Sequence, residues 1–327
     1  LVHQMESDFI GYGHTDYTHK IMAGQDKNAD ADIFVSTWQS IYKQPTKWFD
    51  QFDVVIGDEA HLFKAQSLTK ILIKLGNCKY RYGFTGTLDE TQTHRLVLEG
   101  LFGPVMQAVQ TKELIENKTL ADFRIKCLVL KYPDNVKKDL AKSTYQDEIS
   151  FLISNNYRNA FIKNLALSRT GNTLLLFQMV EKHGRILYDI INSEAKDRKV
   201  FFVHGGVDAE TREEIRAITE KENDAIIVAS YGTFSTGINI KALHNIIFAS
   251  PTKSRIRNLQ SIGRGLRRGE NKESATLYDI SDDLCWKSYN NHTLKHFAYR
   301  LKIYKEEEFK FKLYNIRLNY DSHTKII

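Results

Sequence analysis

The stretch VVIGDEAHLF, residues 54–63, decides the fold. Three apolar residues and Gly57 run directly into two adjacent carboxylates, Asp58 and Glu59, and His61 follows two places later. A short apolar run that ends at a glycine predicts a buried strand, so the acids come at its carboxyl end. Ligands of open parallel sheets bind at the carboxyl ends of the strands. We therefore expect a ligand site at these acids, with Gly57 letting the backbone leave the strand tightly.

Strands and helices alternate along most of the chain. Short apolar runs predict strands at 33–36, 52–56, 80–85, 125–130, 173–177, 200–203, 225–229, 245–249 and 275–280. Helical periodicity lies between many of them, at 65–75, 150–168, 181–192 and 208–219. This alternation predicts an α/β fold with mainly parallel sheets covered on both faces. The later stretch FKFKLYNIRL alternates apolar and polar residues, which is typical of an edge strand.

One segment interrupts the alternation. Residues 109–144 hold a short helical pattern, a strand and then a charged stretch. Because domain boundaries usually fall in polar segments, we expect a first domain over 1–110, a connecting segment over 111–140 and a second domain over 141–327.

Bulk composition excludes some classes of protein. Apolar residues make up 42% and charged residues 26%, as in ordinary globular proteins. The net charge of +6 fits a polyanion-binding face without demanding one. None of the three cysteines is spaced as CxxC, which argues against a disulfide framework or a structural zinc site and favours the reducing cytoplasm. No apolar run approaches the ~18 residues that a membrane span needs, so we expect no membrane partner.

Two neighbouring carboxylates at a strand end suit a metal–nucleotide site. One acid can hold Mg²⁺, which prefers one or two carboxylates together with phosphate oxygens. The other can activate a water for attack on a γ-phosphate. For the acid pair alone, an acidic surface turn is an equally good interpretation.

The residues Asp58, Glu59, Ala60 and His61 resemble motif II, the DEAH box, of the superfamily 2 helicases. Further motifs of that family follow in the same order. FTGTL resembles motif III, IIVASYGTFSTGINI resembles motif V, and QSIGRGLRRG resembles motif VI. IFVSTWQSI resembles motif Ib, and VHGGVDAETR resembles the His-Gly stretch of the second domain.

The resemblance implies two RecA-like domains that bind ATP and Mg²⁺ between them. It implies that Asp58 holds the metal, that Glu59 is the general base, and that Arg264 and Arg267 contact the transferred phosphoryl group. Arginine suits that role because its planar fork clamps phosphate oxygens bidentately. The remaining roles fall in three groups. Nucleotide binding is implied for Asp58, Gly237, Asn239 and Gln260, and coupling of the two ligand sites for His61, Thr85 and Thr87. Nucleic-acid binding is implied for Ser36, Thr37, Gln39, His204, Gly205, Ser230 and Thr233.

No phosphate loop of the form GxxxxGK[ST] occurs in the sequence. In the resembling family this loop lies upstream of the DEAH box, so we expect the sequence to begin inside the first motor domain. Without the loop's amide groups and lysine, this chain alone is expected to hydrolyse little ATP. Its first sheet is expected to expose apolar surface.

Within that superfamily the wording around the DEAH box resembles the recombination and fork-remodelling helicases of bacteriophages. That resemblance implies a monomer in the host cytoplasm that acts on single-stranded DNA, branched DNA and RNA–DNA hybrids in recombination, repair and replication. Two alternatives stay open: an RNA helicase, and a nucleic-acid-binding module without ATPase activity. A third, the motor subunit of a restriction nuclease, lacks an evident nuclease cluster of carboxylates and lysine.

Overall fold

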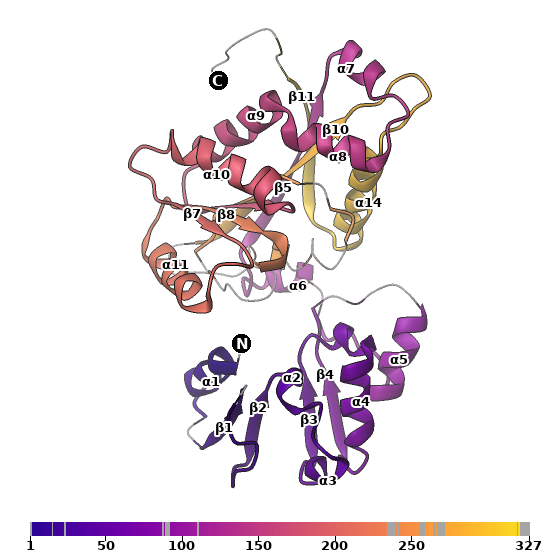
Figure 1. The fold of residues 1–327 in the computed structure, drawn as a ribbon, viewed down its shortest axis with the longest axis vertical. Coiled ribbons are helices and arrows are strands. Elements are labelled where there is room, and N and C mark those ends of the chain that lie inside the picture. Colours follow the sequence, from indigo (N-terminus) through magenta and orange to yellow (C-terminus); the bar gives the residue numbers. More distant parts are fainter. Residues whose placement is uncertain are drawn as a thin grey trace. The chain divides into compact units, whose positions relative to one another are not determined.

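The chain forms two compact units in the computed structural model, Leu1–Gln107 and Ala108–Ile327 (Figure 1). The structure describes residues 2–14, 16–22, 24–86, 88, 92–109, 111–233, 240, 242–250, 252–254, 259, 261–263, 266, 272–318 and 320.

The first unit contains two short parallel sheets. β1 (Thr18–Ile21) pairs with β2 (Ile33–Ser36), and β3 (Val54–Gly57) pairs with β4 (Tyr80–Gly83). The helices are α1 (Val2–Gly11), α2 (Trp38–Ile41), α3 (Thr46–Phe49), the 3-10 helix η1 (Ala60–Lys64), α4 (Gln66–Lys74) and α5 (Gln92–Phe102). Helix α4 turns an apolar side toward a small core that includes Phe49, Phe63, Leu72, Leu75 and Leu98.

One face of the β3–β4 sheet is exposed. The register places Val54 opposite Tyr80 and Ile56 opposite Tyr82, and all four side chains lie on this face. The exposed fraction is 49% for Val54, 55% for Tyr80, 65% for Ile56 and 49% for Tyr82. The apolar surface expected for the first sheet lies here.

The second unit is built on a seven-stranded sheet in which every pairing is parallel. Its order is β11-β5-β10-β9-β6-β8-β7. The strands are β5 (Asp122–Lys131), β6 (Thr173–Phe177), β7 (Val200–Val203), β8 (Ile226–Ser230), β9 (Asn245–Phe248), β10 (Ser274–Asp283) and β11 (Lys310–Arg317). The helices are α6 (Thr111–Glu116), α7 (Asp134–Asp139), α8 (Tyr145–Ser154), α9 (Asn156–Leu167), the π-helix η2 (Val180–Gly184), α10 (Arg185–Asn192), α11 (Ala209–Lys221) and α14 (His292–Glu306). The prediction of an α/β fold with a mainly parallel sheet is confirmed.

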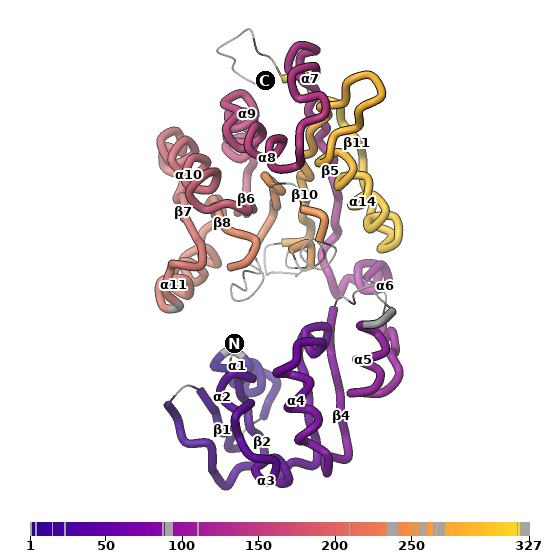
Figure 2. Tube along the Cα trace, turned by 45° about the vertical axis from the view of Figure 1, so that its right-hand side comes forward, coloured from indigo at the N-terminus to yellow at the C-terminus, as the bar shows by residue number. Residues whose placement is uncertain are grey.

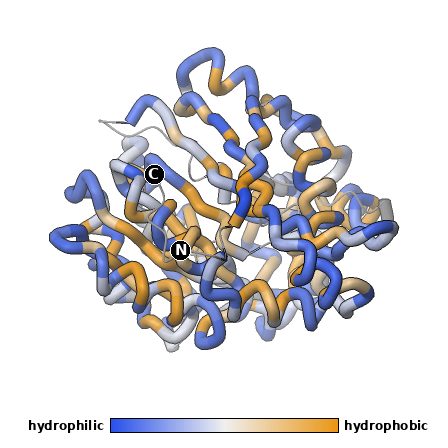
Figure 3. The backbone as a smooth tube through the Cα atoms, turned by 90° about the horizontal axis from the view of Figure 1, so that it is seen from above, coloured by the Kyte–Doolittle hydropathy of each residue, from blue (hydrophilic) through white to orange (hydrophobic). Residues whose placement is uncertain are grey.

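Helices cover both faces of this sheet (Figure 2). Side chains from α8, α9 and α10 share one core with alternate residues of β5, β6 and β10, and α11 and α14 share the other. Every residue of β6 and β8 is buried, which explains why their sequences are continuous apolar runs. Figure 3 shows hydrophilic segments at the outer loops and apolar segments between them.

Local capping sets two of the helix starts. Asp208 precedes α11, and its side chain caps the helix by accepting a hydrogen bond from the Thr211 amide at 2.8 Å. Thr144 and Asp147 form a reciprocal capping box at the start of α8.

The structure differs from the sequence-based expectation in three places. The segment 111–140, expected to connect two domains, contributes β5, which pairs with both β10 and β11 inside the second sheet. The helix expected over 150–168 is divided into α8 and α9 at Asn155, whose side chain caps α9. Strand β1 was not predicted, because its sequence THKI is short and half polar. In the described part of the chain, no helix is both long and apolar enough to cross a membrane.

Candidate functional site

The acid pair follows β3 directly. The β3–β4 pairing continues past the strand ends, since the Phe84 amide donates to the Gly57 carbonyl at 2.9 Å and the Ala60 amide donates to the Phe84 carbonyl at 2.8 Å. Between these bonds the chain turns at Asp58 and Glu59. The Asp58 carboxylate accepts the Glu59 amide at 2.8 Å, which fixes the turn.

The strain of this turn lies at Glu59. Its backbone is left-handed, with φ 49° and ψ 49°, a conformation that costs a non-glycine residue about 1–3 kcal/mol and is concentrated at functional sites. The Glu59 side chain remains 42% exposed, and Asp58 is exposed as well. Both carboxylates therefore reach solvent at the carboxyl end of the strand.

Gly57 is needed for a different reason from the one expected. Its φ is not in the left-handed region, but a Cβ there would lie 2.9 Å from Phe63 Cζ and 3.1 Å from Phe102 Cζ. The rings of Phe63 and Phe102 pack edge to face at 5.1 Å directly over the strand end. The glycine thus makes room for the aromatic pair beneath the turn.

His61 links the DEAH box to motif III, here called the threonine motif, which contains Thr85. The imidazole is only 4% exposed, and its Nδ1 lies 2.8 Å from Thr85 Oγ1 and 3.2 Å from Glu59 Oε2. The structure therefore brings together three residues that the sequence assigned to catalysis and coupling. The buried imidazole thus contacts a residue of the DEAH box and a residue of motif III.

Three further expected residues lie at or just after the carboxyl end of β2. The Ser36 hydroxyl donates to the Ile21 and Thr37 carbonyls, at 3.3 Å and 2.9 Å. Thr37 precedes α2, and its hydroxyl bonds to that of Ser40 at 3.0 Å, while Gln39 is exposed. Ser36 and Thr37 thus have local partners, and Gln39 is open to a ligand.

In the second unit, four expected residues lie at or just after the carboxyl ends of β7 and β8, which are neighbours in the sheet. The Ser230 hydroxyl donates to Thr233 Oγ1 at 2.8 Å, and both side chains are buried. Gly205 is exposed, and a Cβ on it would lie 3.9 Å from Thr233 Oγ1. His204 Nδ1 accepts the Gly206 amide at 3.1 Å. The two loops are adjacent, and Gly205, Gly206 and Gly232 are exposed in them.

Sequence reasoning missed a buried polar network at the ends of β6 and β9. The imidazole of His183, on η2, lies 3.1 Å from Ser250 Oγ and 3.3 Å from Asn159 Oδ1. The Ser250 hydroxyl also accepts the Gln178 amide at 3.2 Å. Burial, and then the charge of Arg158, lower the pKa of His183 to about 3, so the ring is neutral. A histidine in a helical segment carries no sequence signal of this kind.

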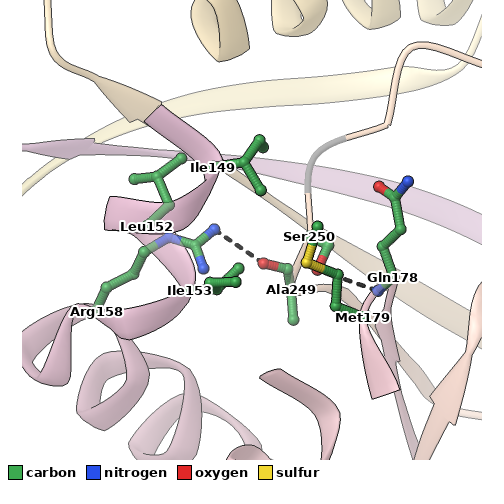
Figure 4. Close-up of a pocket in the computed structure, with 8 residues that line it drawn as sticks. All are labelled: Ile149, Leu152, Ile153, Arg158, Gln178, Met179, Ala249 and Ser250. Atoms are coloured by element: carbon green, nitrogen blue, oxygen red, sulfur yellow. Dashed lines mark hydrogen bonds between the residues drawn. The ribbon is translucent and has the colours of Figure 1, made fainter. Parts of the chain in front are cut away.

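Arg158 lies beside this network (Figure 4). Its guanidinium is fully buried, contacts Asp282 at 2.9 Å and 3.1 Å, and donates to the Ala249 carbonyl at 2.8 Å. Tyr132 donates its hydroxyl to the same carboxylate at 2.7 Å, and burial raises the tyrosine pKa. Arg158 Nη1 has no hydrogen-bond partner in the described part of the chain. These bonds tie α9 to the carboxyl ends of β9 and β10.

Six expected residues lie outside the described residues: Thr87, Gly237, Asn239, Gln260, Arg264 and Arg267. For Mg²⁺, the exposed Asp58 carboxylate is the kind of donor that the ion takes together with water and phosphate oxygens. Within the ranges that the structure describes, there is no group of three or more His, Cys, Asp or Glu side chains that could hold a metal without such help. The donor set therefore fits a magnesium–nucleotide complex better than a free metal ion.

Two family models match the chain. Residues 1–90 match the type III restriction enzyme, res subunit, and residues 156–269 match the helicase conserved C-terminal domain. The chain is 35% identical over 337 residues to the ATP-dependent DNA helicase UvsW of Enterobacteria phage T4, covering 97% of this chain and 66% of that protein. It is 27% identical over 244 residues to the putative ATP-dependent RNA helicase L396 of Acanthamoeba polyphaga mimivirus, covering 72% of this chain and 44% of that one. This chain thus spans less than two thirds of these relatives' lengths.

Solved structures agree with these matches. The crystal structure of T4 UvsW superposes with a TM-score of 0.53 at 34% identity, covering 97% of this chain and 65% of that one. The fragment structure of a putative HsdR subunit of a type I restriction enzyme from Vibrio vulnificus has a TM-score of 0.68 at 20% identity, covering 94% and 56%. At that identity the second likeness shows the fold alone.

Proposed function

Because this chain belongs to the superfamily 2 helicases, we propose that it carries the motor of an ATP-dependent DNA helicase. The two compact units would be its RecA-like domains. The observation that supports this best is the position of His61, whose buried ring contacts both Glu59 of the DEAH box and Thr85 of the threonine motif. An acidic surface turn has no need of such a link.

The proposed chemistry assigns one task to each residue of the turn. Glu59, exposed at its outer edge, accepts the proton of the attacking water as general base. Asp58 holds Mg²⁺, which when bound neutralises charge on the phosphate oxygens. The left-handed backbone at Glu59 directs the two carboxylates to these separate tasks.

Residues of the second unit are also proposed to act on the nucleotide. Arg264 and Arg267 are proposed to contact the γ-phosphoryl oxygens, where arginines of other NTPases contribute roughly 10³–10⁵ in rate. Gly237, Asn239 and Gln260 are proposed to bind the nucleotide beside them. Changes in the position of the nucleotide would pass through His61 and Thr85, with Thr87, to the nucleic-acid side.

The proposed nucleic-acid contacts lie on both units. Gln39 and Gly205 are exposed and available to a phosphate backbone, whereas the buried Ser230 and Thr233 would shape the loop beside Gly205. Ser36, Thr37 and His204 would act in the same loops. We propose DNA as the nucleic acid, because the relative with 35% identity is named a DNA helicase. Branched DNA, including forks, Holliday junctions and R-loops, is the proposed substrate in recombination and repair, because the stretch around the DEAH box resembles the fork-remodelling helicases.

The experiment is ATP hydrolysis by the complete protein, measured without nucleic acid and with single-stranded DNA, forked DNA and single-stranded RNA of equal length. We expect the largest stimulation with forked DNA. Greater stimulation by RNA than by either DNA would favour an RNA helicase, the function named for the mimivirus relative. Binding of all three without any hydrolysis would contradict the motor and favour a simple binding module.

A further inference from the structure

The sheet of the second unit carries a cluster of positive charge far along the chain from every helicase motif. We define the β11–β5 basic cluster as Arg124, Lys126, Arg169, Lys310 and Lys312. Among the described strands, β11 is the outer one of this sheet and pairs in parallel with β5 alone (Figure 1). Four of its residues lie in the amino-terminal halves of β5 and β11, whereas Gly205 and Ser230 lie at the carboxyl ends of β7 and β8.

The strand register places four of these cations side by side. Lys310 is opposite Arg124, and Lys312 is opposite Lys126. Partners in register share a face of the sheet, adjacent strands lie ~4.8 Å apart, and alternate residues of one strand lie ~6.6 Å apart. The four cations therefore form a compact quadrilateral.

Aromatic rings show which face this is. Lys126 Nζ lies 5.6 Å from the centre of the Tyr278 ring, and Lys312 Nζ lies 5.5 Å from that of Tyr314. Both tyrosines pack against the core shared with α8, α9 and α10. Arg169, just after α9, adds the fifth charge, with its guanidinium 5.4 Å from the Tyr278 ring and a hydrogen bond to its hydroxyl at 3.1 Å.

The positive charge of the cluster is largely uncompensated. Like charges on directly opposing residues destabilise a sheet, yet two such pairs occur here in succession. Among the residues that the structure describes, only Arg124 has a carboxylate partner, Asp122 at 3.1 Å. Arg124, Lys310 and Lys312 are exposed. A folded surface that keeps this arrangement is suited to a polyanion.

We propose that the β11–β5 basic cluster binds the phosphate backbone of a duplex arm of the nucleic-acid substrate. The inference rests on the proposed helicase function for its ligand class. The paired strands space the Cα atoms of these residues at the intervals just given, which lets their side chains reach successive phosphates of one strand. Tyr278 is buried beneath two cations and Tyr314 is half-buried, so neither offers a free face for base stacking. The contact is therefore to the backbone and independent of sequence.

The test uses the complete protein without nucleotide and a blunt DNA duplex, with affinity measured by fluorescence anisotropy between 50 and 200 mM salt. The variant is Lys310→Gln with Lys312→Gln. The matched control is Lys295→Gln with Lys302→Gln, which removes two exposed charges from α14 on the opposite face of the sheet. Each phosphate contact contributes about 0.9 to the slope of log affinity against log salt. The loss of two contacts should thus reduce the magnitude of the slope by about 1.8 in the variant. Raising the salt from 50 to 200 mM should then weaken duplex binding by a factor about twelvefold smaller in the variant than in the parent. The control should keep the parent slope.

An unchanged slope in the variant, an equal change in the control, or no duplex binding by the parent would each overturn the proposal. A variant that keeps the duplex slope but loses binding to phosphatidylserine vesicles would overturn it in favour of a membrane surface. Hydrolysis stimulated by saturating single-stranded DNA separates this test from that of the helicase itself. The variant should retain that stimulation, and its absence in the parent would contradict the motor whatever the duplex slope.

Discussion

The two units of this chain support their polar groups in opposite ways. In the first, β3 and β4 have four residues each, one face of their sheet is exposed, and the acids lie at the surface. In the second, β6 and β8 are buried throughout, and two arginines are buried completely beside aspartates, Arg158 with Asp282 and Arg300 with Asp279. The first unit thus presents its carboxylates at the surface, at the end of a short strand. In the second unit, buried arginine–aspartate pairs connect strands to helices.

This difference predicts separate consequences for substitutions. Substitutions in the turn at Asp58 and Glu59, here called the acid turn, should alter ATP hydrolysis and leave the free energy of unfolding almost unchanged, because both carboxylates are exposed. Changes in the buried pairs should alter stability, because they leave an uncompensated charge in the core.

The largest effect is expected for Glu59→Gln in the complete protein. Losing the general base should reduce ATP turnover by roughly 10²–10⁴-fold. Nucleotide affinity should remain within a few-fold, since the amide keeps the size of the side chain. Turnover measured at saturating ATP and DNA, together with binding of a fluorescent ATP analogue, checks both expectations. A large decrease in the thermal unfolding midpoint of Glu59→Gln would contradict the difference proposed between the two units.

The greatest loss of stability is expected for Arg158→Met. It leaves Asp282 buried without its cation, which costs about 3–5 kcal/mol. Denaturant unfolding of the second unit measures the loss. The matched control is Arg216→Met, which removes a surface pair with Glu213 (2.5 Å) and should cost no more than about 1 kcal/mol. Equal losses in both variants would show that burial of the pair does not matter.

Acid should destabilise the second unit through His183. Its pKa is about 3 in the folded state, against an ordinary value of 6.5. Above pH 6.5 the ring is neutral in both states. Between pH 6.5 and 3 the unfolded chain takes up a proton that the folded chain excludes. The free energy of unfolding therefore decreases as the pH is lowered, by up to about 1.4 kcal/mol per pH unit. Denaturant unfolding at pH 7, 6 and 5 should show a steeper decline in the parent than in His183→Gln, and parallel declines would contradict the lowered pKa.

The smallest effect is expected for Thr85→Val. It removes the hydroxyl that bonds to His61, a change worth about 1 kcal/mol in stability. Basal ATP hydrolysis should persist while stimulation by DNA declines, because the link between the acid turn and the threonine motif is broken. The ratio of stimulated to basal rates measures this, and Thr69→Val, which removes a hydroxyl bonded to the Phe63 carbonyl, is the matched control. A parent-like ratio in Thr85→Val would remove the coupling role.

Much of the fold could be predicted because buried parallel strands are visible as continuous apolar runs. The predicted strands at 33–36, 173–177 and 200–203 coincide with β2, β6 and β7. The segment 111–140 contributes β5 to the sheet, which its sequence does not indicate because the charged α7 follows the strand. Its place inside the sheet depends on pairing with β10 and β11, which are more than 140 residues later.

The position of the acid turn could be predicted from the sequence, but the residues that pack around it could not. The aromatic pair at Gly57 arises from packing between segments that are distant in the sequence. Arg158 and His183 look like solvated side chains of helical segments, and only tertiary contacts bury them. The opposed lysines of β5 and β11 become neighbours through strand register alone.

The central claim is that Glu59 and Arg267 act on one phosphoryl group. The direct measurement is a double-mutant cycle of Glu59→Gln and Arg267→Ala in the complete protein, read by single-turnover hydrolysis of radiolabelled ATP with saturating DNA. Groups that act together in one catalytic site are strongly non-additive. We predict that Arg267→Ala slows the parent by about 10³-fold or more but slows the Glu59→Gln variant far less. Losses that multiply in full would contradict a shared site.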